Sequence, residues 1–249
     1  MTTTAIRGRV QVEPGQRRVR GYVRGIPVFD TVRPLLVWES PHYPAYYIPV
    51  GDVRESALVP TGSTEHSPSR GDAELYNIRI GETEIPGAAR MYLQSPLEEI
   101  RQAVRFDWAA IDAWFEEDEQ IFTHPRSPHT RVDILPSSRL VRVEADGVLL
   151  AESMHGRALF ETGLPVRWYL PKVDVRMDLL TPTGTTSGCP YKGTAQYWSA
   201  RVGDRVIEDA VWSYPTPLPE SERIAGLVSF YPDKVQVSID GVPLGGSAH

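Results

Sequence analysis

Cysteine is nearly absent from this chain of 249 residues, whose single cysteine, Cys189, cannot form an intrachain disulfide. Histidine is also scarce, and none of the six histidines lies four residues from another, so we expect no metal site. Long apolar runs are missing, and no membrane partner is expected. The first residues lack the apolar core of a signal peptide, which together with the lone cysteine predicts a cytoplasmic protein.

A basic excess is missing too, because the net charge is −6, and a nucleic-acid partner is therefore not expected. Seven arginines within residues 1–37 and the acidic block Glu116–Glu119 are interpreted as solvated faces or as complementary surfaces between domains. The chain has no phosphate-binding Gly-rich loop with Gly-Lys-Ser/Thr, no Gly-x-Ser-x-Gly and no Cys-x-x-Cys. No cofactor is predicted.

The sequence does contain a long internal repeat. Residues 17–92 and 139–214 align at a constant shift of 122, with 23 identities in 76 positions and no gap. Unrelated segments of average composition would share about one position in sixteen. A period of this size corresponds to a whole folded domain copied in tandem.

The segment Thr181–Gly193 is the centre of the second copy. We predict that it is a loop rich in hydroxyl groups and glycine, and it contains the cysteine. Its twin is Val59–Gly71, where Ser67 stands for Cys189 and Arg70 for Lys192. Shared residues such as Thr183 and Gly184 are expected to specify the shape of the loop in both copies, so a function peculiar to the second copy is sought in Cys189, Tyr191 and Lys192.

Alternating apolar residues separated by turn signals predict short strands throughout. Hairpins are expected at Asp146-Gly147 and at Gly203-Asp204, and strands close to 227–231 and 234–239. Short helices are predicted over Glu220–Ala225 and, with Ser95 as N-cap, over Ile100–Val104. A helical turn is the first interpretation of 173–180, with a strand as the alternative.

These elements predict a mainly β protein made of two tandem homologous domains, each a small β-barrel or β-tent-like fold with one short helix. We expect an N-terminal domain over 1–115, a connecting arm rich in acidic, proline and histidine residues over 116–138, and a C-terminal domain over 139–249. Aromatic residues of 106–115 are expected to be buried against a domain or between domains.

Cys189 is the candidate catalytic residue. A thiolate is the reactive form of cysteine, and a nearby cation such as Lys192 lowers the pKa of a thiol. The alternative is that Cys189 is a small buried apolar residue. His155 is the most attractive base in the same copy, although no feature of the sequence places it near the thiol.

A ligand is the second possibility for this copy. Its loop hydroxyls, the repeated Asp-Val-Arg motif and several aromatic side chains could surround a small polar molecule. Structural ion pairing explains Asp-Val-Arg equally, and core packing is the ordinary role of the aromatic residues. The candidate ligand-binding residues are Lys192, Tyr191, Arg176, Asp174, Thr183, Thr186, Trp198 and Trp212.

The motifs Asp174-Val175-Arg176, Cys189-Pro190-Tyr191-Lys192-Gly193 and Ala210-Val211-Trp212-Ser213-Tyr214 together resemble the family called domain of unknown function 427, in a tandem form. The resemblance covers 17–115 and 139–240 and is degraded in the first copy. It implies small β-rich, tent-like domains and a bacterial cytoplasmic setting, with no established activity. A nucleotidyltransferase-like label accompanies the family, but the chain lacks the Gly-Ser loop and Asp-x-Asp pair that this chemistry needs.

Three functional hypotheses follow. The leading one is that the C-terminal copy binds a small polar or anionic ligand, with a nucleotide-like molecule as one option, that Lys192 and Arg176 are charge partners, and that the first copy is mainly structural. The second is an enzyme that uses Cys189 as a nucleophile or redox thiol. The third is a non-catalytic interaction scaffold, with a homo-oligomer left open.

Overall fold

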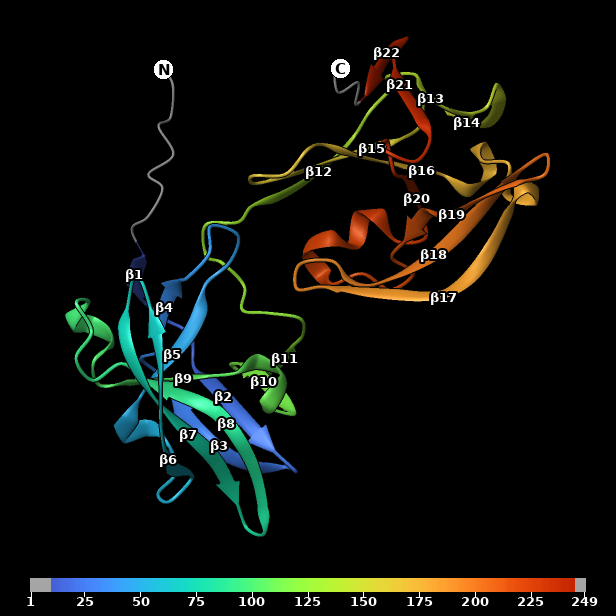
Figure 1. Cartoon of the computed structure of the whole chain (residues 1–249). Helices are drawn as coiled ribbons and strands as arrows, with labels where there is room; N and C mark the ends of the chain where they lie inside the picture. The colour runs from blue at the N-terminus through green and yellow to red at the C-terminus, as the bar shows by residue number, and fades with distance from the viewer. Residues whose placement is uncertain (1–9, 245–249) are drawn as a thin grey trace, which may run out of the picture. The chain divides into compact units, whose positions relative to one another are not determined.

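A computed structural model of the chain describes residues 10–244 and shows two compact units, which divide between Ser127 and Pro128 (Figure 1). Each unit has one sheet of seven strands and one of four, so the mainly β class is confirmed. The strands at the two ends of each sheet have only one neighbour, and no closed barrel forms among the described residues. The duplication seen in the sequence is therefore a duplication of structure.

The first unit has a large sheet in the order β1-β4-β5-β9-β8-β7-β6 and a small sheet in the order β11-β10-β2-β3. Its short 3₁₀ helices lie in the connections. The strands are β1 (Gln11–Pro14), β2 (Val19–Val23), β3 (Ile26–Thr31), β4 (Leu35–Trp38), β5 (Ala45–Pro49), β6 (Leu58–Ser67), β7 (Gly71–Ile80), β8 (Thr83–Met91), β9 (Ala103–Phe106), β10 (Ala113–Glu116) and β11 (Glu119–Ile121), and the helices are η1 (Val50–Asp52), η2 (Glu98–Ile100) and η3 (Trp108–Ala110).

The second unit repeats this plan, with a large sheet in the order β12-β15-β16-β20-β19-β18-β17 and a small sheet in the order β14-β13-β21-β22. Figure 1 shows β17, β18 and β19 as its longest strands. The strands are β12 (Val132–Pro136), β13 (Val141–Ala145), β14 (Val148–Ser153), β15 (Arg157–Glu161), β16 (Arg167–Leu170), β17 (Leu180–Cys189), β18 (Gly193–Val202), β19 (Arg205–Ser213), β20 (Val228–Phe230), β21 (Gln236–Ile239) and β22 (Val242–Leu244), and the helices are η4 (Lys172–Asp174), η5 (Met177–Leu179) and η6 (Pro219–Ile224).

The large sheet of the second unit is covered on both faces. Side chains alternate along a strand, so Trp168 and Leu170 of β16 belong to the core between the two sheets, whereas Tyr169 belongs to a second cluster with Trp212, Tyr214 and Ile224. Ile224 lies in η6, which covers part of this second face. We call the face that carries Tyr169 and Trp212 the outer face, because it faces away from the small sheet.

Several predicted elements are confirmed. The hairpins turn at Asp146-Gly147 and Gly203-Asp204, and a helical segment occurs at Pro219–Ile224, although it is a 3₁₀ helix. The helical interpretation of 173–180 is also right in part, because η4 and η5 flank a single bridge between Val175 and Ala151. Strands form close to 227–231 and 234–239, but they belong to different sheets.

Two predictions are wrong. The expected loop 181–193 is mostly the edge strand β17, which has a bulge between Pro182 and Thr186. The expected helix over 100–104 ends after one turn, η2, although the Ser95 hydroxyl accepts a hydrogen bond from the Leu97 N–H at 3.1 Å. Val104 and Phe106 are instead buried in β9 between β5 and β8, because burial in the sheet outweighs the local capping signal.

The segment 116–138, expected to be a connecting arm, supplies strands to both units. β11 is hydrogen-bonded to β10 of the first unit, and β12 is hydrogen-bonded to β15 of the second. The acidic block meets the arginines of the first unit: Glu116 pairs with Arg17, and Asp118 pairs with Arg20 at 2.8 Å. The aromatic side chains of Phe106 and Trp114 pack within the core of the same unit.

Candidate functional site

Lys192 forms an ion pair with Glu161 on the second unit's large sheet. Lys192 lies in the turn between β17 and β18, Glu161 ends β15, and their side chains are only 10% and 9% exposed. Buried charges are costly unless they are paired, so each of these groups requires the other. The positive charge of Lys192 is therefore engaged within the protein.

The first unit has the same ion pair at the equivalent positions. Arg70 meets Glu39 at 2.6 Å, and both residues are related to Lys192 and Glu161 by the shift of 122. Burial alone would raise the pKa of Glu39, but the charges of Arg105 and Arg70 and the hydroxyl of Tyr47 outweigh it, so the pKa lies below its ordinary value. The pair is thus a feature of the duplicated fold, and it does not distinguish the second copy.

Aromatic side chains do distinguish the second copy. Trp212 of β19 packs against Tyr231 with ring centroids 4.3 Å apart, and its indole N–H donates to the Tyr169 hydroxyl at 3.1 Å. Tyr231 is stacked parallel to Tyr197 of β18 at 6.5 Å. The Tyr197 hydroxyl lies 2.6 Å from the hydroxyl of Ser187 on β17. Five neighbouring segments therefore contribute to one cluster of aromatic rings and hydroxyl groups, in which Trp212 and Tyr197 are buried, Tyr231 is half-buried and Ser187 is exposed.

A guanidinium group lies over one ring of this cluster. The Arg167 side chain, at the start of β16, is centred 5.7 Å above the Trp212 ring. Arg167 is half-buried, and within residues 10–244 it has neither an ion pair nor a hydrogen bond to its side chain. A cation over an indole face is attracted by the ring, but the positive charge is not neutralised. We call Arg167, Ser187, Tyr197, Trp212 and Tyr231 the aromatic patch.

The equivalent surface of the first unit is occupied by ion pairs. Strand pairing places Arg90 where the second unit has Trp212 and Asp107 where it has Tyr231. Arg90 meets Asp107 at 2.6 Å and Glu65 at 2.9 Å, and Glu65 takes the place of Ser187. The first unit thus neutralises its arginine internally, whereas the second unit leaves Arg167 without a carboxylate.

The structure separates the predicted charge partners of a ligand. Arg176 precedes η5 and pairs with Asp178 at 2.7 Å, while Lys192 lies beyond the other end of β17. A strand of ten residues spans about 30 Å, so the two cations cannot hold one small molecule. Asp174 of η4 is also distant from Lys192, and it accepts a hydrogen bond from the Ser153 hydroxyl at 2.6 Å.

The contact between Asp174 and Ser153 explains the repeated Asp-Val-Arg motif. In the first unit Asp52 accepts a hydrogen bond from the Thr31 hydroxyl at 2.7 Å, and the bridge from Val175 to Ala151 is repeated between Val53 and Phe29. The motif therefore fastens a 3₁₀ turn to the small sheet in both units. This geometry favours the structural interpretation of the motif.

Other predicted residues also divide between the two faces. Trp198 points to the inner core, where the Lys172 ammonium lies 5.2 Å from its ring, whereas Trp212 is on the outer face. Tyr191 is buried, and its carbonyl accepts a hydrogen bond from Ser221 at 3.0 Å. Thr183 donates to Asp209 at 2.7 Å, and Thr186 is exposed after the bulge.

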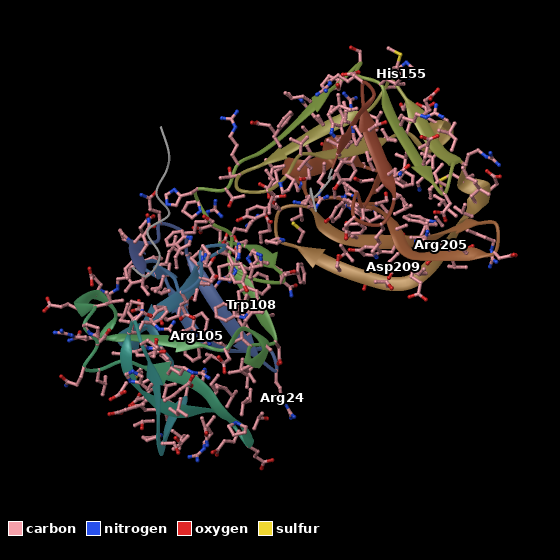
Figure 2. All side chains as sticks on the ribbon, turned by 45° about the horizontal axis from the view of Figure 1, so that its top comes forward. Arg24, Arg105, Trp108, His155, Arg205 and Asp209 are labelled. Atoms are coloured by element: carbon pink, nitrogen blue, oxygen red, sulfur yellow. The ribbon has the colours of Figure 1, made fainter. Side chains whose placement is uncertain are left out.

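Cys189 is the last residue of β17 and packs, half-buried, against the outer-face cluster. Among the described residues, no hydrogen bond joins its sulfur to Lys192 or to a histidine. His155 is 82% exposed and lies 3.7 Å from Asp174. Figure 2 shows His155 at the surface near β14, away from the long hairpin that carries Asp209. The structure therefore does not pair the thiol with the expected base.

Sequence reasoning missed Glu161, Arg167 and Tyr231 as members of this region. The recurrence of Glu39 as Glu161 at the same shift as Arg70 and Lys192 was a usable signal for the ion pair. Arg167 and Tyr231 have no such signal, because they replace different residues and lie on separate strands.

Within residues 10–244, no group of three histidine, cysteine or acidic side chains could hold a metal ion, and no helix is long and apolar enough to cross a membrane.

Comparison with known proteins gives a family without an assigned activity. A family model described as Domain of unknown function (DUF427) matches residues 11–117 and again residues 133–241. No curated protein matches the chain. The two matched segments coincide with the two duplicated sheet pairs and together cover most of the sequence. The chain belongs to the DUF427 family and contains two copies of its domain in tandem.

Proposed function

We propose that the second unit binds a small planar ligand with an anionic group at the aromatic patch. The observation that carries the proposal is Arg167, a half-buried guanidinium that lies over Trp212 without a carboxylate partner in the described chain. A guanidinium is suited to carboxylate or phosphate oxygens, which it can bind through two parallel hydrogen bonds. Such an anion would provide the missing charge partner.

The rest of the patch supports a planar ligand. Tyr231 is half-buried next to Trp212, so the accessible part of its ring can pack against a flat molecule. Ser187 is exposed and has a hydroxyl that can donate or accept a hydrogen bond. A nucleotide-like molecule combines a flat ring with anionic oxygens, so it belongs to the proposed ligand class.

Arg167 takes the role first expected for Lys192 and Arg176. Lys192 is engaged with Glu161, and Arg176 with Asp178 at the other end of β17. The first unit, where Arg90 is already paired with Asp107 and Glu65, is proposed to be mainly structural. The proposal thus assigns ligand binding to the features in which the two copies differ.

The test is a thermal-shift and calorimetric screen of nucleotides, aromatic carboxylates and aromatic phosphates. Arg167→Gln should weaken binding of a hit at least tenfold, which corresponds to about 1.4 kcal/mol. Arg176→Gln is the matched control, because it removes an exposed arginine from the same unit and should leave binding unchanged. The proposal fails if no compound of these classes binds, or if both variants bind equally well.

The thiol hypothesis makes a different prediction at the same place. Cys189 is half-exposed and borders the outer-face cluster, so an added thiol reagent could reach it. Cys189→Ser introduces the residue found at the equivalent position of the first copy, Ser67. If Cys189 is only a neighbour of the ligand, this variant keeps ligand binding. Loss of a chemical conversion with binding retained would instead support a nucleophilic or redox role.

A further inference from the structure

A second feature of the second unit lies at the edge of its two sheets. The strands β12 and β22 are edge strands of the large and the small sheet, and residues from both line a groove of about 370 Å³. Leu135, Phe160 and Val242 are 50%, 43% and 64% exposed along it, and Trp168 lies at its floor. Arg139 is the charged residue of the lining. We call this feature the edge groove; it is distinct from the aromatic patch on the outer face.

The first unit has a buried carboxylate at the equivalent place. The Glu116 side chain is 2% exposed and is paired with Arg17 and, at 3.0 Å, with Arg126. It also accepts a hydrogen bond from the hydroxyl of Tyr46. These groups form a compact polar network in the first unit, in which a buried carboxylate pairs with arginines.

The second unit keeps the arginine and replaces the rest of the network. Val19 faces Glu116 across the small sheet of the first unit, and the equivalent Val141 faces Ile239 in the second. Ile239 therefore takes the place of Glu116. Trp168 and Arg139 stand at the positions of Tyr46 and Arg17 by the shift of 122. The polar network has become an apolar groove with a guanidinium at its rim.

From this exchange we propose that the edge groove binds a small apolar monocarboxylate, such as an arylalkanoic acid. Its apolar body would pack on Trp168, Phe160 and Val242, and its carboxylate would pair with Arg139, as the Glu116 carboxylate pairs with Arg17. The groove volume falls in the range of small-molecule sites, about 300 to 1,000 Å³. A cation beside an otherwise apolar lining is complementary to one anionic group on an apolar molecule.

Release of Arg139 from its present ion pair to bind such a ligand requires little free energy. It now pairs with Asp240 at 2.6 Å, but the two side chains are 55% and 48% exposed. Exposed ion pairs contribute little to stability, so a carboxylate that also buries apolar surface can replace Asp240 as the partner. Arg139 already lies 5.5 Å from the centre of the Trp168 ring, at the entrance of the groove.

The experiment is a nuclear magnetic resonance titration of the full chain with 4-phenylbutyrate and, separately, with 4-phenylbutanamide. The acid should shift resonances of the groove residues and bind more tightly than the amide. Arg139→Gln should weaken binding of the acid about tenfold and leave the amide unchanged. Arg131→Gln is the matched control, because Arg131 forms an exposed pair with Asp133 in the same unit and does not line the groove.

A second variant transfers the network of the first unit into the groove. The double change Ile239→Glu with Trp168→Tyr supplies the internal carboxylate and its hydroxyl partner, and it should abolish binding of the acid. Circular dichroism checks that this variant is folded, and Val242→Asp, at an exposed position of the lining, serves as the alternative if it is not. Equal affinities for acid and amide, binding that ignores Arg139, or shifts confined to the aromatic patch would each overturn the proposal.

Discussion

Lys192 and Glu161 form a buried ion pair in the second unit at the positions where Arg70 and Glu39 form one in the first. The side chains of Lys192 and Glu161 are only 10% and 9% exposed, so removal of one partner leaves an unpaired buried charge in the protein. We expect Glu161→Gln to destabilise the second unit by about 3 to 5 kcal/mol. Urea unfolding followed by circular dichroism measures this loss.

A double variant separates pairing from packing in that experiment. Glu161→Gln combined with Lys192→Met removes both charges, and it should recover much of the stability lost in the single variant. Arg205→Gln is the control, because it breaks an exposed pair with Asp146 and should cost less than about 1 kcal/mol. A single-variant loss as small as that of the control would show that the buried pair contributes little.

The ion pair of the first unit predicts a dependence of stability on pH. Arg105, Tyr47 and Arg70 hold the pKa of Glu39 below its ordinary value against the opposing effect of burial. The unfolded chain therefore binds a proton more readily than the folded chain. The stabilisation is fully present above an unfolded pKa of about 4.3, and it disappears as the pH falls through the lower folded value.

Unfolding free energies of the parent protein and of Glu39→Gln between pH 7 and pH 3 test this dependence. The parent protein should be more stable than the variant at pH 7, and the difference should shrink below about pH 4. A difference that stays constant across this range would mean that Glu39 has the same pKa in the folded and unfolded chain.

Local signals in the sequence predict the hairpins well, but they fail where tertiary contacts determine the secondary structure of a segment. Asp146-Gly147 specifies a tight turn, and the hairpin forms there. The glycine and proline residues of 181–193 suggest a loop, but Pro182, Gly184 and Gly188 lie on an edge strand, where a missing N–H donor and a bulge are tolerated. The Ser95 hydroxyl does accept a local hydrogen bond from the Leu97 N–H, but it does not cap η2, and Val104 joins the central strand that follows.

Tertiary contacts in the candidate site are likewise not predictable from local sequence signals. The shift of 122 identifies Lys192 as the counterpart of Arg70, but only the structure shows that both are paired with a glutamate on another strand. The sequence makes both Trp198 and Trp212 candidate ligand-binding residues, but alternation along their strands places them on opposite faces of the sheet. Arg167 reaches Trp212 from a separate strand, and no spacing rule connects the two residues.

The hydrogen bond from Trp212 to the hydroxyl of Tyr169 gives a further prediction. Burial raises the pKa of Tyr169 above its ordinary value, so its hydroxyl is neutral and accepts from the indole N–H at 3.1 Å. Tyr169→Phe should cost about 1 to 3 kcal/mol, because the buried N–H loses its acceptor. Tyr76→Phe is the control in the first unit, where the hydroxyl donates to Glu74 in an exposed position, and thermal unfolding compares the two.

Asp209 offers a test in which backbone strain and side-chain hydrogen bonds act in opposite directions. It has a φ of 46°, in the left-handed region, where the equivalent residue of the first unit is Gly87 with a φ of 60°. Its carboxylate accepts hydrogen bonds from Thr183 at 2.7 Å and from Thr185 at 2.8 Å, so these bonds hold the bulge of β17 against β19. Figure 2 places Asp209 on the long hairpin of the second unit.

Three substitutions at Asp209 separate the two effects. Asp209→Ala keeps the strain and loses both hydrogen bonds, so it should be the least stable, by about 1 to 2 kcal/mol relative to the parent. Asp209→Gly removes the strain and should recover about 0.4 to 1 kcal/mol of that loss. Asparagine tolerates the same backbone region and keeps a hydrogen-bond acceptor. We therefore expect the free energy of unfolding of Asp209→Asn, measured in urea, to be the closest to that of the parent. An alanine variant as stable as the glycine variant would show that the bulge relaxes to a different backbone conformation.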